Sequence, residues 1–213
     1  MESHIREPFN AISHFLAAIA ALLGTIYLLI FNWGHPKIWF AFLVYGISVI
    51  LLFTSSALYH YSNVDDKKLI KLRKLDHSAI YLLIAGSYTP ICVYFFSGFW
   101  QWGLLAIIWS LAIIGIVVKL FIIQAPRWVT AGVYLIMGWL CVIGFNEILT
   151  RMPLGAIIWL AVGGLFYTLG AIIYITKRIN IIPGVLGFHE IWHIFVILGA
   201  LSHFILMIRF INP

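Results

Sequence analysis

The sequence predicts an all-α integral membrane protein built as a bundle of seven transmembrane helices, and two observations support this prediction. First, 63% of the 213 residues are hydrophobic and only 9% are charged, a composition far outside the range of soluble globular domains. Second, the apolar residues fall into segments long enough to span a bilayer, which takes about 20 residues of helix. Because lipid surrounds the outward faces of such helices, these faces need no polar surface.

Seven apolar segments can be marked off, and short connections with turn-forming or polar residues separate most of them. Tryptophans near several segment edges, such as Trp33, Trp100 and Trp128, are typical of interfacial belts. The first segment is interpreted as a retained helix, because no basic stretch precedes it and no small-residue cleavage site stands out. The segments are expected to form a single domain over residues 1–213, and they cover residues 9–31, 38–60, 77–96, 102–123, 128–149, 154–175 and 188–210.

Lysine and arginine sort to one side of the membrane when seven spans are counted. Ten of the 13 lie at the N-terminus and in the second, fourth and sixth connections, whereas Lys37, Arg151 and Arg209 lie on the opposite side. This distribution predicts a cytoplasmic N-terminus, an outside C-terminus and a multi-pass protein of the plasma membrane. The second connection, residues 65–75, alternates apolar and basic residues in a way that suits a short helix lying on the membrane, although an orientation signal explains it equally well.

Polar residues within or beside the apolar segments converge at one depth. An ionisable group in the hydrocarbon region costs a few kcal/mol or more by itself, so it needs a partner or a function. With seven spans, the second segment ends, and the first, third and seventh begin, on the predicted cytoplasmic side. Four segments therefore contribute polar groups near that face: Glu7, Asn10, His14, Ser56, His60, Asp76, His189 and His193.

The spacing of two of these histidines indicates a metal site. His189 and His193 are four residues apart, so on a helix they share one face, about one turn (~5.4 Å) apart. His60 is the natural third ligand, because catalytic zinc takes three protein ligands and keeps one position for water. Asp76 is expected to hold that water or to act as a fourth ligand. Ser56, one turn before His60, is expected to orient it. The sequence therefore predicts one zinc ion per chain.

Other polar residues are expected either to support the metal ligands or to lie too far from the ion to bind it. Glu7, Asn10 and His14 are expected to support the ligands and fix their orientation. His203 follows His193 by ten positions, which is ~15 Å along a straight helix. This distance is too large for the same ion, so an interhelical packing role is expected for His203.

Residues 189–193 also match H-E-x-x-H, the signature of zinc peptidases. Under that interpretation Glu190 is the general base of an intramembrane protease, with Asp76 as the third ligand. It leaves His60 and Ser56 without a role, so the three-histidine site is preferred.

Four signatures in order along the chain resemble those of the hemolysin III family, the bacterial branch of the progestin and adipoQ receptor (PAQR) superfamily. They are EPFNAISH at 7–14, SALYH at 56–60, KLDHS at 74–78 and HEIWH at 189–193, and the run 79–90 also looks typical. The resemblance implies seven helices with a cytoplasmic N-terminus. It also implies zinc bound by His60, His189 and His193, with Asp76 close to the water on the metal and Ser56 beside the site.

The resemblance and the donor set together predict a zinc-dependent hydrolase of a lipid amide or ester, similar to ceramidases and involved in membrane lipid homeostasis. Its expected partners are membrane lipids, with no nucleic acid. Asp76 is expected to accept a proton from water and deliver it to the leaving group. Two other functions stay open: a non-enzymatic sensor of membrane state with structural zinc, and the pore-forming cytolysin that the family's hemolysin name suggests. No amphipathic pore-lining stripe is evident for the latter.

Overall fold

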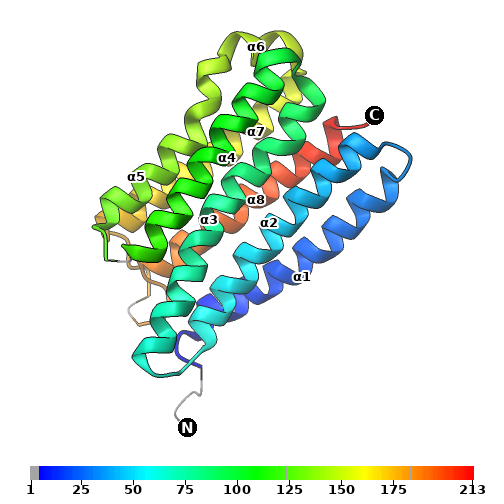
Figure 1. Ribbon diagram of the computed structural model, residues 1–213. Helices are drawn as coiled ribbons and strands as arrows, with labels where there is room; N and C mark the ends of the chain where they lie inside the picture. The colour runs from blue at the N-terminus through cyan, green and yellow to red at the C-terminus, as the bar shows by residue number, and fades with distance from the viewer. Residues whose placement is uncertain (1–4, 123, 183) are drawn as a thin grey trace.

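The computed structural model describes residues 5–122, 124–182 and 184–213, and the regular elements in these ranges are helices. Seven helical segments among the described residues are long and apolar enough to cross a membrane, which confirms the predicted fold class. The start of α1 and the C-terminus lie at opposite ends of the bundle (Figure 1). The elements are α1 (Pro8–Phe31), α2 (Pro36–Tyr61), α3 (Asp66–Phe95), α4 (Gly98–Phe121), α5 (Arg127–Gly138), the 3₁₀ helix η1 (Trp139–Gly144), α6 (Phe145–Arg151), α7 (Leu154–Thr176) and α8 (Phe188–Phe210).

Local sequence signals set where several helices begin. Pro8 and Pro36 occupy the first positions of α1 and α2, where a missing backbone N–H costs nothing. Asp65 caps α3 by accepting the backbone N–H of Lys68 at 3.0 Å. The first turns of α1 and α3 and the last turn of α2 lie at one end of the bundle, here called the N-terminal end (Figure 1).

Helix α8 brings the first and last parts of the chain together. Sequence neighbours pack against each other from α1 to α4, and α8 packs on α7 while also touching α1 and α3 (Figure 1). Glycines allow the close approach of α7 and α8: a Cβ on Gly163 would lie 2.4 Å from the His203 ring, and one on Gly199 would lie 2.7 Å from the Tyr167 ring. The first turns of α1 and α8 and the last turn of α2 lie side by side, joined by the hydrogen bonds of Glu7 with His60 and of Asn10 with Glu190.

Helix α3 differs from its predicted form. The apolar pattern predicts a helix over 77–96, with residues 65–75 as a connection that suits a short surface helix or serves only as an orientation signal. In the structure α3 runs without a break from Asp66 to Phe95. The Asp65 cap starts the helix, and no glycine or proline follows it before Gly86 and Pro90, so nothing interrupts it at residue 76. The basic residues of the connection therefore belong to α3, which is 30 residues long. Ile123, the last residue of the predicted fourth helix, lies outside the described residues.

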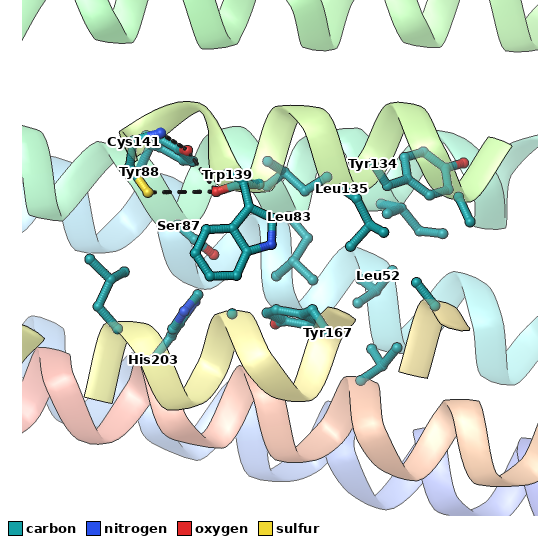
Figure 2. A pocket seen from close by; sticks show the side chains of 18 of the residues that line it. Leu52, Leu83, Ser87, Tyr88, Tyr134, Leu135, Trp139, Cys141, Tyr167 and His203 are labelled. Carbon is teal, nitrogen blue, oxygen red and sulfur yellow. Dashed lines mark hydrogen bonds between the residues drawn. The ribbon is translucent and has the colours of Figure 1, made fainter. Parts of the chain in front are cut away.

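The fifth span is broken in the middle. It was predicted as one helix over 128–149, but α5, η1 and α6 share its length. The Tyr88 hydroxyl lies 3.0 and 2.8 Å from the carbonyl oxygens of Met137 and Gly138, and accepts the backbone N–H of Cys141 at 2.9 Å (Figure 2). A side chain from α3 thus satisfies backbone groups that the break frees, which is how irregular backbone is tolerated at membrane depth.

Candidate metal centre

The three predicted metal ligands meet at the N-terminal end of the bundle. His60 lies in the last turn of α2, and His189 and His193 lie in the first two turns of α8. One ligand nitrogen from each lies within 4.8 Å of the other two, and the two Nε2 atoms on α8 are 3.1 Å apart. Bonds of 2.0–2.1 Å in a tetrahedral zinc site give nitrogen–nitrogen separations of about 3.3 Å. The histidine group can therefore hold one metal ion.

Glu7 orients the ring of His60 from a segment that lies outside the helices. The backbone N–H of Glu7 donates to the carbonyl oxygen of His60 at 3.0 Å, and this contact holds the chain across the end of α2. The Oε2 atom of Glu7 lies 2.6 Å from Nδ1 of His60. Because the carboxylate can only accept, Nδ1 carries the proton and Nε2 stays free for a metal.

The carboxyl group of Glu7 is held in its ionised form. Burial by itself raises the pKa of Glu7, but the hydrogen bonds from His60 and the Asn10 amide, together with the Arg6 charge, outweigh it and hold the pKa at about 2. Arg6 lies 3.3 Å from the other oxygen of Glu7 and donates to the Tyr59 carbonyl at 2.8 Å. Arg6 was not predicted as part of the site. Arg6 lies beside the Glu7 carboxylate because the two residues are adjacent in the segment that precedes α1.

His14 holds the ring of His193 through its Nδ1 atom, as Glu7 holds the ring of His60. Its Nε2 atom lies 2.8 Å from Nδ1 of His193, and both side chains are buried. The Nε2 atom of His193 is left to face His189. Metal-binding imidazoles are characteristically held through their second nitrogen, which fixes both tautomer and ring orientation. The donor set and these two contacts fit a zinc ion, for which imidazole is a common ligand.

Asn10 links the carboxylates of Glu7 and Glu190, and its contact gives Glu190 a structural role. Its amide donates to Glu7 at 3.1 Å and to Oε1 of Glu190 at 3.0 Å. The other oxygen of Glu190 accepts the backbone N–H of Gly187 at 3.0 Å, which caps the start of α8. The glutamate of the H-E-x-x-H pattern is therefore engaged by α1 and by its own helix. Its position three residues after Gly187, at a helix start, is the sequence signal that would have indicated this cap.

Asp76 and Ser56 lie beside the histidines and face a cavity. Asp76 is 6% exposed and Ser56 is 2% exposed, and both line a cavity that His14 and His193 also line. The Oδ2 atom of Asp76 lies 3.2 Å from Nδ1 of His77. Among the described residues, the group with converging ligand atoms consists of the three histidines without Asp76. This arrangement favours a role for Asp76 in holding the water beside the metal over a role as a fourth ligand.

The cavity is apolar for most of its length and has a volume of about 260 Å³. Its lining includes both His193 and His203, which are ~15 Å apart along α8 at 1.5 Å per residue. Figure 2 shows its middle and far part, where Trp139, Tyr167 and His203 project from η1, α7 and α8. His203 takes the packing role expected of it, against Gly163 and the Tyr167 ring. An elongated apolar cavity therefore meets the histidine group at one end.

Comparisons with known proteins agree with this architecture. The family model described as "Haemolysin-III related" matches residues 3–204. The chain is 36% identical over 197 residues to "Hemolysin-3 homolog" of Bacillus subtilis, covering 92% of this chain and 89% of that protein. It is 37% identical over 209 residues to "Hemolysin-3" of Bacillus cereus, covering 96% and 91%. A more distant match, 35% identical over 150 residues, covers 62% of this chain and 33% of "Adiponectin receptor protein" of Drosophila melanogaster. The chain is a multi-pass membrane protein and belongs to the haemolysin-III related family.

Proposed function

We propose that this protein is a zinc-dependent hydrolase of a lipid amide or ester. The observation that carries the proposal is the position of the histidine group. Three ligand nitrogens converge within 4.8 Å of one another at one end of an apolar cavity inside a bundle of membrane-spanning helices. A purely structural metal needs no access to such a cavity, whereas a substrate with an acyl chain does.

The donor set suits hydrolysis. Zinc held by three neutral imidazoles keeps its positive charge, acts as a Lewis acid and lowers the pKa of a bound water to about 7. Glu7 and His14 hold two of the three rings in the orientation that presents Nε2 to the metal. A site with rings fixed in advance needs little rearrangement when charge develops during the reaction.

Asp76 and Ser56 take the roles of proton carrier and hydrogen-bond donor. Among the described residues that line the cavity, Asp76 carries the one carboxylate, so it accepts the proton of the attacking water and returns it to the leaving amine or alcohol. The hydroxyl of Ser56, one turn from His60 on α2, donates to the oxygen on which negative charge develops. The apolar walls hold the acyl chain and keep bulk water out.

The experiment compares wild type with Asp76→Asn, both purified, loaded with zinc and supplied with a panel of N-acylated and O-acylated lipids. The readouts are fatty acid release and zinc content. We expect wild type to release fatty acid from at least one class, and Asp76→Asn to keep its zinc while losing about 10²–10⁴-fold in rate. Glu147→Gln, which removes a carboxylate outside the cavity lining, is the matched control and should keep the wild-type rate. An unchanged rate in Asp76→Asn, or no release by wild type, would contradict the proposal.

A further inference from the structure

Three cationic side chains from three helices lie at the N-terminal end, beside the cavity lining. They are Arg73 on α3, Lys119 on α4 and Arg127 on α5. Lys74, the neighbour of Arg73, donates to the carbonyl of Leu120, the neighbour of Lys119. Lys119 in turn donates to Thr130 in the first turn of α5, which Arg127 begins. No carboxylate in the described part of the chain forms an ion pair with any of the three. Like charges repel, so this group, here called the cation cluster, needs an anion.

Lys119 differs from an ordinary interfacial lysine. It is only 4% exposed, whereas Lys67, Lys68 and Lys71 of the same end are exposed. Its ammonium donates to the hydroxyl of Thr130 at 3.1 Å, and an ammonium has three donors to satisfy. A lysine that served only to orient the chain in the membrane would have no reason to be buried.

Arg127 is fixed in place without being neutralised. Its guanidinium carbon lies 5.1 Å from the ring centres of both Tyr174 and Phe188, and its Nη1 atom is buried without a hydrogen-bond partner. Arg127 is also the first residue of α5, whose first turn has no acidic residue and no side-chain cap. A helix start carries partial positive charge, so it disfavours a cation and favours an anion.

We propose that Arg73, Lys119 and Arg127 bind the phosphate group of an anionic lipid headgroup. Arginine offers a planar fork of donors that matches phosphate oxygens, and lysine adds a compact charge. The depth is also suitable, because these residues lie at one end of their membrane-spanning helices. Free phosphate has the same chemistry as the headgroup, so the experiment has to separate the two sources.

The cluster lies next to the cavity and to the histidine group. Thr130 and Tyr174, which contact Lys119 and Arg127, both line the cavity. The Tyr174 ring also lies 6.0 Å from the ring of His189. A lipid whose phosphate binds at the cluster can therefore extend its apolar chain into the cavity. This inference concerns lipid binding and does not depend on hydrolysis at the metal.

The test measures binding to the purified full-length protein in neutral detergent by isothermal titration calorimetry. The probes are short-chain phosphatidylglycerol, short-chain phosphatidylcholine and inorganic phosphate. We expect phosphatidylglycerol to bind more tightly than the other two, and Arg127→Gln and Lys119→Met each to raise its dissociation constant by about tenfold or more. Lys71→Gln, which removes an exposed cation from the same end, should bind as wild type does.

Two controls keep the result interpretable. Circular dichroism and zinc content verify that each variant is folded, and Arg73→Gln, which alters a partly exposed side chain, replaces Lys119→Met if that variant does not fold. If inorganic phosphate binds as tightly as phosphatidylglycerol with the same dependence on the variants, the cluster is confirmed as a phosphate site and the lipid as its source is refuted. No binding of any probe, or an equal loss in Lys71→Gln, would overturn the proposal.

Discussion

The two ends of the cavity use histidine in opposite ways. At the N-terminal end, His60 and His193 each engage a partner through Nδ1, which leaves Nε2 directed at a shared point. At the far end, both ring nitrogens of His203 are buried without a hydrogen-bond partner. Its ring packs on Gly163 and lies 5.6 Å from the Tyr167 ring. A held second nitrogen thus distinguishes the ligand rings of His60 and His193 from the ring of His203.

This contrast separates a polar network from a packing contact. The network around the histidine group runs from Arg6 through Glu7 to Asn10 and Glu190, so that each carboxylate has several donors. A buried polar group without a partner costs about 1–3 kcal/mol. At His203 the close fit of the ring against a glycine offsets part of that cost. Four substitutions test whether the histidines at the two ends differ in this way.

His60→Ala removes one of three ligands and should abolish stoichiometric zinc binding. We expect wild type to hold about one zinc ion per chain and the variant to retain almost none after dialysis, because two α8 histidines alone chelate weakly. Elemental analysis against protein concentration measures this directly. A variant that keeps its zinc would mean that the ion binds somewhere else.

Glu7→Gln leaves all three ligands in place but weakens the hold on the His60 ring. Loss of such an outer partner typically costs 10–100-fold in metal affinity, and we expect a loss in that range by competition with a chelator. Glu147→Gln, in which the Arg151 ion pair near the other end of the bundle is lost, is the matched control. Equal affinities for Glu7→Gln and wild type would show that the carboxylate does not support the ligand.

Glu190→Gln distinguishes a cap from a catalytic base. Because the side chain binds the start of α8 and the Asn10 amide, we expect a stability loss of about 1 kcal/mol with hydrolysis retained. Thermal unfolding and the lipid assay give the two readouts. A loss of activity by several orders of magnitude with stability intact would instead favour the peptidase-like role for Glu190.

His203→Phe should have the smallest effect. A ring of similar volume keeps the contact with Gly163 and removes the unpaired nitrogens, so we expect a stability change below about 1.5 kcal/mol. Zinc content should equal that of wild type. A fall in zinc content would remove the distinction between the two ends of the cavity.

The sequence predicted the seven spans and the converging histidines because both follow from local patterns. Apolar length sets the spans, and the four-residue spacing of His189 and His193 places them on one face. The broken fifth span could not be predicted, because a Tyr88 hydroxyl from another helix satisfies its freed backbone groups. The Arg6 and Glu190 contacts depend on how the N-terminal segment crosses α2 and meets α8. Helix periodicity carries no information about such a crossing.

The cation cluster, like the broken fifth span, could not be predicted from the sequence. Arg73, Lys119 and Arg127 were counted with the other basic residues as orientation signals, which any charged connection can provide. Their common feature is that they lack carboxylate partners while two of them contact the cavity lining. That feature exists only after α3, α4 and α5 have packed, so composition and charge counts do not reveal it.

X-ray absorption spectroscopy at the zinc edge, on the purified and metal-loaded protein, tests whether the three histidines bind zinc. We expect about one zinc ion per chain with three imidazole nitrogens at 2.0–2.1 Å and one oxygen ligand. The imidazole scattering should fall when His193→Ala is measured beside wild type. Sulfur ligation, an all-oxygen shell, or a spectrum unchanged in His193→Ala would contradict a zinc site formed by His60, His189 and His193.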